Sequence, residues 1–231
     1  MPETTLENIC DWYHKYADDL RIVRKEQREL RALHPAMNAQ LDDLEAEITY
    51  LLLREQQPAT VLEVGSLHGW STTWILRALR DNGAGVLITH DLIDNARRHV
   101  PRDLAAGRWT FVPGDARQTL RGHAHRIDYL FIDAAHTASF ARWFVSELFP
   151  TVRSGVTVSV HDVFHGRRPW PFSEGRVVLS WLAEKSVAYF TPSRLAAAPV
   201  NRELKAVKER LGLQQPVHDG RDDPMLFFRM P

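Results

Sequence analysis

The spacing of hydrophobic positions changes near residue 58, and this change predicts two parts of the chain. Over residues 4–57, apolar side chains recur at three- and four-residue steps, which is the spacing of amphipathic helices. His34-Pro35 interrupts the pattern, because a residue that precedes proline disfavours the helical conformation. We therefore expect two helices in residues 1–57, forming an N-terminal helical cap, and a second part that covers residues 58–231.

From Thr60 onward, short apolar runs alternate with helical patterns. The runs at residues 127–132 and 156–160 are almost continuous, as in parallel strands that helices cover on both faces. The alternation predicts an α/β fold with a doubly wound, Rossmann-like sheet of about seven strands, the last one antiparallel. Strands are expected at residues 60–64, 86–91, 108–112, 127–133, 155–161, 186–191 and 225–230, and helices at 70–81, 94–105, 115–121, 137–149, 176–184 and 200–212.

Charge and composition argue against several classes of function. The 231 residues include 29 basic and 29 acidic ones, so there is no excess of positive charge for nucleic acid. The mixed run Arg21–Arg31 is expected to be a solvated helix face. No apolar stretch approaches the ~18–20 residues that span a bilayer, and no signal-peptide pattern is seen. The single Cys10 is typical of a reducing compartment.

These features predict a cytoplasmic protein that forms a single structural domain, with no nucleic-acid or membrane partner. The long helices of the cap carry apolar stripes. Such stripes could also bury an interface between two copies of the chain, so a homo-oligomer, in the simplest case a dimer, is expected.

Residues 59–72 carry the most informative local pattern. The first expected strand ends beside Glu63, and a turn with Gly65 and Gly69 follows before the next helical pattern. Glycines let a ligand lie against bare backbone, and the following helix presents unpaired N–H groups. Glu63 would repel a pyrophosphate but attract an amino group or a ribose hydroxyl. The pattern therefore favours S-adenosylmethionine over a dinucleotide.

Acidic residues lie at or near the ends of the first five expected strands. They are Glu63, Asp91, Asp115, Asp133 and Asp162. In open α/β sheets a ligand binds beyond the carboxyl ends of the strands. One aspartate there can simply favour a turn. Acids at all five ends suit a ligand with two ribose hydroxyls, an exocyclic amine and a cationic amino-acid end.

These residues resemble class I S-adenosylmethionine-dependent methyltransferases, specifically the small-molecule O-methyltransferases of the catechol O-methyltransferase-like and macrolide or sugar O-methyltransferase groups. Leu62–Ser71 matches the family's first motif, and the resemblance extends to about Phe164. It implies that Asp91 accepts from the ribose hydroxyls, with Asp94 as the alternative, and that Asp115 accepts from the adenine amine. The cofactor-binding residues expected from it are Glu63, Gly65, Ser66, Gly69, Ser71, Asp91, Asp115, Ala116 and Asp133.

The same resemblance implies a metal site at the ends of the fourth and fifth strands. Asp133 and Asp162 correspond to acids that hold a divalent cation in metal-dependent members, and their oxygens suit Mg²⁺. His161 departs from the pattern, since this subgroup often has an acid or an amide there. A histidine would shift the preference toward Mn²⁺, Fe²⁺ or Zn²⁺, or would not bind the metal. The expected metal ligands are Asp133, His161 and Asp162.

His136 is the expected general base. It follows Asp133 by three residues, where the strand turns into a helix, so its ring could face the same crevice. Methyl transfer to an aliphatic hydroxyl needs a base with a pKa near 7 or a Lewis acid. The resemblance implies the same role, and Asp133 is counted with His136 as catalytic. The alternative is a histidine bonded to backbone at a helix start.

The sequence thus predicts an S-adenosylmethionine-dependent enzyme that methylates a hydroxyl of a small molecule, of the secondary-metabolite class. Two alternatives remain open. One is a metal-independent N- or O-methyltransferase in which Asp133 and Asp162 orient His136; the other is a cofactor-binding protein of this fold repurposed for non-methyl chemistry. The roles of His165 and of loop 163–175 are open, and the acceptor itself is not predicted.

Overall fold

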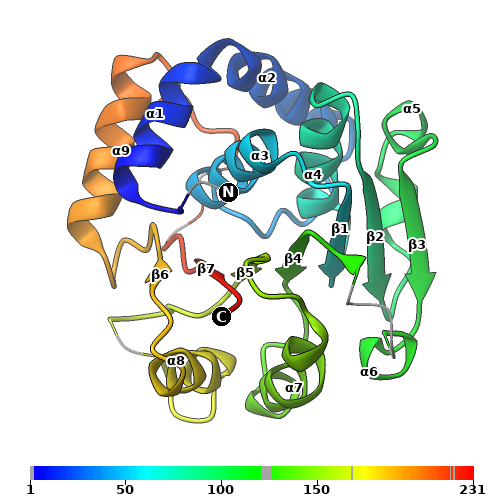
Figure 1. Cartoon of the computed structure of the whole chain (residues 1–231). Helices are drawn as coiled ribbons and strands as arrows, with labels where there is room; N and C mark the ends of the chain where they lie inside the picture. The colour runs from blue at the N-terminus through cyan, green and yellow to red at the C-terminus, as the bar shows by residue number, and fades with distance from the viewer. Residues whose placement is uncertain (1–2, 121–125, 168, 219, 221) are drawn as a thin grey trace.

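In the computed structural model, one seven-stranded sheet lies between two layers of helices (Figure 1). The structure describes residues 3–120, 126–167, 169–218, 220 and 222–231. The strands are β1 (Thr60–Val64), β2 (Val86–Asp91), β3 (Trp109–Pro113), β4 (Tyr129–Ile132), β5 (Thr157–Val160), β6 (Tyr189–Phe190) and β7 (Leu226–Arg229).

The strand order is β3-β2-β1-β4-β5-β7-β6. Strands β1 to β5 run parallel, and β7 runs antiparallel to both β5 and β6. The predicted doubly wound sheet of seven strands with an antiparallel last strand is confirmed.

Helices cover both faces of the sheet. On one face lie α1 (Leu6–Lys15), α2 (Ala17–Leu33), α3 (Asp43–Gln56), α4 (Trp70–Asp81), α5 (Arg102–Ala105) and α9 (Ala198–Arg210); on the other lie α6 (Ala116–Thr119), α7 (Ala138–Trp143) and α8 (Glu174–Glu184). Successive side chains of a strand point to opposite faces of the sheet, so Val61 packs in one hydrophobic core and its neighbour Leu62 packs in the other, together with Val64.

The N-terminal cap contains three helices where two were expected. The predicted break at His34-Pro35 is confirmed, but α1 and α2 are also separated at Tyr16, and residues 34–42 form no helix. Met37 and Leu41, whose spacing fitted a helix, are buried from this irregular segment. Helix α3 instead begins after Asp42, where a capping box with Glu45 satisfies the first N–H groups.

Two other predicted helices are shorter or irregular. Residues 94–105 hold only a 3-10 turn (Ala96–Arg98) and the short α5, with Pro101 between them, because proline interrupts helical hydrogen bonding. Helix α7 continues into a π-helical turn (Phe144–Leu148) and a 3-10 turn (Phe149–Thr151).

The sheet register places the ends of the central strands side by side. Val64 of β1 pairs with Ile132 of β4, which pairs with Val160 of β5. The residues that immediately follow these three parallel strands therefore meet at one edge of the sheet. Between β1 and β4 the order of the strands along the sheet reverses, which is where ligands of such folds bind.

Candidate active site

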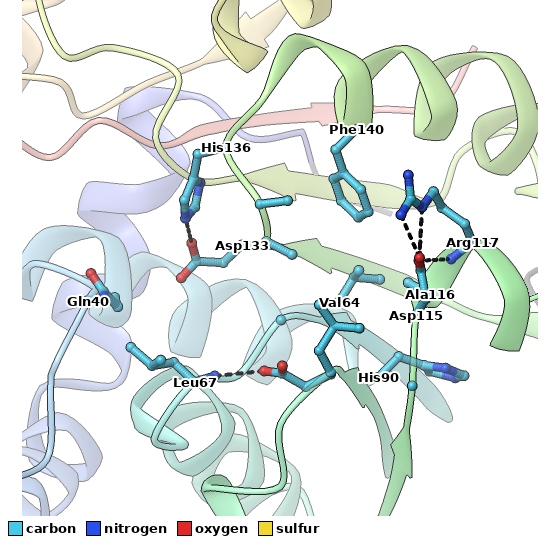
Figure 2. A pocket seen from close by; sticks show the side chains of 16 residues that line it. Gln40, Val64, Leu67, His90, Asp115, Ala116, Arg117, Asp133, His136 and Phe140 are labelled. Carbon is cyan, nitrogen blue, oxygen red and sulfur yellow. Dashed lines mark hydrogen bonds and ion pairs between the residues drawn. The ribbon is translucent and has the colours of Figure 1, made fainter.

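A cavity of about 290 Å³ opens at the carboxyl ends of β1 to β4 (Figure 2). This volume is near the lower end of the range for small-molecule sites. Six of the predicted site residues line it: Gly65, Asp91, Asp115, Ala116, Asp133 and His136. Three of the five strand-end acids, Asp91, Asp115 and Asp133, therefore line one cavity.

Gly65 brings bare backbone to the cavity wall. Its φ is +88°, and a Cβ atom there would lie 2.0 Å from the carbonyl oxygen of Asp133, so no other residue fits. Gly69 caps α4 with a φ of +85° and lies outside the wall. Of the two glycines in the first motif, only Gly65 faces the cavity.

Asp91 shapes the glycine turn as well as lining the cavity. Its Oδ2 accepts hydrogen bonds from the backbone N–H groups of Ser66 (2.7 Å) and Leu67 (2.9 Å), and its Oδ1 accepts from Ile93 N–H (3.1 Å). Asp94, the alternative, pairs with Arg97 at 3.3 Å and does not line the wall. Of these two acids, Asp91 is therefore the one that faces the cavity.

Asp115 caps α6 and forms an ion pair with Arg117, which was not among the predicted site residues. Its carboxylate accepts from the Arg117 backbone N–H (2.9 Å) and from the Arg117 guanidinium (2.6 Å). The guanidinium lowers the pKa of Asp115. Arg117 also lines the cavity (Figure 2). A basic residue in a short helix carries no motif, so only the structure reveals it.

Glu63 is fully buried and lies behind the wall. It accepts hydrogen bonds from the hydroxyls of Ser71 (2.7 Å), Thr72 (2.8 Å) and Thr89 (2.7 Å), tying β1 to α4 and β2. Burial raises its pKa to about 7 against these bonds. Glu63, Ser66, Gly69 and Ser71 are the predicted cofactor residues that do not line the cavity described here.

A cluster of carboxylates and histidines lies at the ends of β4 and β5. His161 is buried, with Nδ1 3.1 Å from Asp133 Oδ1 and 3.3 Å from Asp162 Oδ1, while Nε2 is 3.3 Å from Glu45 Oε2. Burial opposes its protonation, but the charges of Asp133 and Glu45 outweigh burial and raise the pKa of His161 well above its usual value.

His136 faces three carboxylates from the mouth of the cavity. Its Nε2 is 3.5 Å from Asp133 Oδ1, and its Nδ1 is 3.2 Å from Asp162 Oδ2 and 3.4 Å from Glu174 Oε2. Ala135 and His136 both have positive φ, so a left-handed turn aims the ring back at the strand end. Burial opposes protonation, but Glu174, Asp133 and Asp162 raise the pKa of His136 above its usual value.

Glu174 was not among the predicted site residues. It is 1% exposed, at the start of α8, and burial raises its pKa to about 7. In sequence it is an ordinary acid in the first turn of a helix, following the N-cap Ser173. Glu174 reaches the cluster because the start of α8 packs against the segments that follow β4 and β5. The sequence around residue 174 does not predict this packing.

Within the described part of the chain, one group has the geometry of a metal site. Ligand atoms of Asp133, His136 and Asp162 all lie within 4.8 Å of one another. The carboxylates fit a hard divalent cation. The structure groups His136 with the two aspartates, whereas both ring nitrogens of His161, the predicted ligand, face carboxylates.

Comparison with known proteins supports this description. Residues 62–163 match the family model for a methyltransferase domain. The matched segment runs from Leu62 in β1 to Val163, just after β5, and contains Gly65, Asp91, Asp115, Asp133 and Asp162. No curated protein matches the chain significantly in sequence.

Solved structures share the fold of the matched segment and of the segments that flank it. An O-methyltransferase from Bacillus cereus in complex with SAH is 16% identical, with a TM-score of 0.63 over 98% of this chain and 100% of that one. TomG, an O-methyltransferase from Streptomyces achromogenes involved in tomaymycin synthesis and solved with SAM, is 17% identical, with a TM-score of 0.57 over 90% and 89%.

A putative caffeoyl-CoA O-methyltransferase from Staphylococcus aureus is 13% identical, with a TM-score of 0.57 over 99% and 100% of the two chains. At these identities the likeness establishes the fold. The predicted Rossmann-like methyltransferase fold is confirmed.

Proposed function

We propose that the protein transfers the methyl group of S-adenosylmethionine to a hydroxyl of a small-molecule acceptor of the secondary-metabolite class. One observation carries the proposal: Asp133 and His136 belong both to the cavity wall and to the carboxylate cluster. The cavity proposed for the methyl donor and the cluster proposed for acid–base chemistry therefore adjoin each other at Asp133 and His136. The O-methyltransferase names of the structural neighbours support an oxygen acceptor.

The cavity residues suit the parts of S-adenosylmethionine. Asp91 would accept from the ribose hydroxyls and Asp115 from the adenine amine, while the backbone at Gly65 would lie against the methionine portion. The sulfonium methyl would then lie on the side of Asp133 and His136, which line the same cavity.

His136 is the proposed general base. Nδ1–H donates to Asp162, its nearest carboxylate at 3.2 Å, and Nε2 takes the hydroxyl proton of the acceptor. The acceptor oxygen then forms the bond to the methyl carbon as the bond from carbon to sulfur breaks, leaving a neutral thioether. A positioned base typically contributes about 10²–10⁴-fold.

Asp133 and Asp162 would hold the divalent cation, Mg²⁺ in the first place, with Mn²⁺, Fe²⁺ or Zn²⁺ as alternatives. When bound, such a cation supplies Lewis-acid stabilisation of negative charge on oxygen. In the metal-independent alternative, the same two aspartates only orient His136, as their distances of 3.5 and 3.2 Å to its ring already permit.

Residues 163–167 and 169–173, between β5 and α8, supply an aromatic surface beside the cluster. Trp170 and Phe172 are exposed, and the Trp170 ring is 5.8 Å from that of His165, whose Nε2 is 3.5 Å from Asp162 Oδ1. This surface would bind an acceptor with a flat apolar part.

No helix among the described residues is long and apolar enough to cross a bilayer. The cytoplasmic location and the dimer stay predictions.

Transfer of a labelled methyl group tests the proposal. The protein is incubated with S-adenosylmethionine carrying an isotopic methyl label and a panel of phenolic, sugar and polyketide alcohols with matched amines. We expect the label in an O-methyl product, and we expect EDTA to stop its formation. Label on nitrogen alone, or on no acceptor, would contradict the assignment. Full activity in EDTA would favour the metal-independent alternative.

A further inference from the structure

The Glu174 carboxylate is buried without a hydrogen-bond partner in the described part of the chain. It is 1% exposed, and neither Oε1 nor Oε2 accepts a hydrogen bond there. A buried carboxylate without partners is costly, so an unexplained one indicates a ligand. Its cationic neighbour is His136, at 3.4 Å.

The backbone around Glu174 fixes this position. A Cβ atom on Gly175 would lie 2.3 Å from the carbonyl oxygen of Val163, so glycine lets the first turn of α8 press against the chain just after Asp162. On the other side, Ser173 forms a β-bridge with Thr137, directly after His136. Glu174 is thus held between the two segments that carry the cluster.

Glu174 and Asp162 converge on one atom. His136 Nδ1 is 3.4 Å from Glu174 Oε2 and 3.2 Å from Asp162 Oδ2, while Nε2 is 3.5 Å from Asp133 Oδ1. His161 also contacts both aspartates, and in addition Glu45. His165 Nε2 lies 3.5 Å from Asp162 Oδ1 as well, so four carboxylates, counting Glu45, face three histidines. This is an excess of acid that a bound cation would balance.

We propose that Glu174 is the third carboxylate ligand of a hard divalent cation held with Asp133 and Asp162. This proposal rests on the metal site of the proposed function. It gives Glu174 the place that the sequence had assigned to His161, whose ring is enclosed by Asp133, Asp162 and Glu45. Asp133 and Asp162 follow the ends of β4 and β5, and Glu174 begins α8. Together they form an oxygen-rich set of carboxylates, which Mg²⁺ and Mn²⁺ prefer.

Binding of Mn²⁺ to the full chain, followed by isothermal titration calorimetry without methyl donor or acceptor, tests the proposal. Glu174→Gln keeps the shape and removes the charge; we expect it to weaken Mn²⁺ binding at least about tenfold. The matched control is Glu184→Gln at the exposed far end of α8, which we expect to bind as the wild type does. Circular dichroism confirms that the variants are folded.

Asp162→Asn separates the two possible failures. If Asp162→Asn loses Mn²⁺ affinity while Glu174→Gln keeps it, the metal site stands and the assignment of Glu174 is overturned. If the wild type does not bind Mn²⁺, the metal site of the proposed function fails and the assignment falls with it. Anomalous diffraction from a Mn²⁺ soak gives a second readout: we expect Glu174 oxygen within about 2.6 Å of the ion, and a longer distance overturns the proposal.

Discussion

Two groups of buried charge in this chain differ in how they are balanced. The cap cluster consists of Arg24, Asp43, Glu47 and Lys208, between α2, α3 and α9. Glu47 pairs with Arg24, receives Lys208 Nζ at 2.9 Å and accepts a hydrogen bond from Tyr13 at 2.7 Å. Two acids thus meet two permanent cations.

The strand-end cluster has no permanent cation among the described residues. The ion-pair partners of Asp133, Asp162, Glu174 and Glu45 there are all histidines, and Glu174 lacks a hydrogen-bond partner. A buried group that its own chain balances serves the fold, whereas an unbalanced group beside a cavity indicates a site for a ligand. The following predictions test this distinction.

The largest expected effect is on catalysis. Asp133→Asn removes a proposed metal ligand and a partner of both His136 and His161, so we expect turnover to fall by at least about 10³-fold. Affinity for S-adenosylmethionine should remain nearly that of the wild type, measured by titration calorimetry. The control is Asp103→Asn on α5, outside the cavity. Unchanged turnover in Asp133→Asn would remove the strand-end cluster from the mechanism.

In the cap cluster the expected effect is on stability. Glu47→Gln leaves Arg24 and Lys208 buried with Asp43 as their remaining acid, and we expect the free energy of unfolding to fall by about 3–5 kcal/mol. Urea unfolding measures it. Glu29→Gln is the matched control: Glu29 is exposed and 3.9 Å from Lys25, so its loss should cost less than about 0.5 kcal/mol. Equal effects of the two variants would contradict the comparison.

The sequence predicted the strand-end cluster better than the cap cluster. Strand-end residues follow apolar runs whose order predicts the sheet, and that order alone is enough to bring Asp133 and Asp162 together. Run 21–31 was expected to be solvated, yet Arg24 and Gln27 are buried. The covering segment lies far along the chain, since Arg24 bonds to the carbonyl of Gln215.

Glu174 shows the same limit within the site. Its contact with His136 depends on how α8 packs against the ends of β4 and β5, which is not recorded in the local pattern around residue 174. Arg117 likewise lies in a four-residue helix with no motif. Periodicity and strand ends therefore predict the central sheet and the residues attached to it, while partners supplied by flanking helices require the structure.

The buried Glu63 is intermediate between the two clusters in how its charge is balanced. Three neutral hydroxyls donate hydrogen bonds to its carboxylate, and none of them carries a charge. Its pKa is raised from 4.5 to about 7 by burial, so folding favours the protonated form. Its contribution to stability is full below about pH 4.5 and is lost as the pH rises through 7. We expect the free energy of unfolding of the wild type, relative to Glu63→Gln, to fall by about 3 kcal/mol between about pH 4.5 and 7.5.

Urea unfolding at several pH values measures that difference. The exposed Glu184→Gln variant serves as the control, and its difference from the wild type should change little over the same range. A constant difference for Glu63→Gln would show that the three hydroxyls keep the carboxylate charged in the folded protein.

The smallest expected effect concerns the surface beside the strand-end cluster. Phe172 is 88% exposed, so Phe172→Ala should change the free energy of unfolding by less than about 0.5 kcal/mol. If its ring contacts the acceptor, KM for the acceptor should rise about two- to tenfold, while KM for S-adenosylmethionine stays constant. Leu33→Ala, an exposed apolar residue at the end of α2, is the control. A KM unchanged in both variants would place the acceptor away from Phe172.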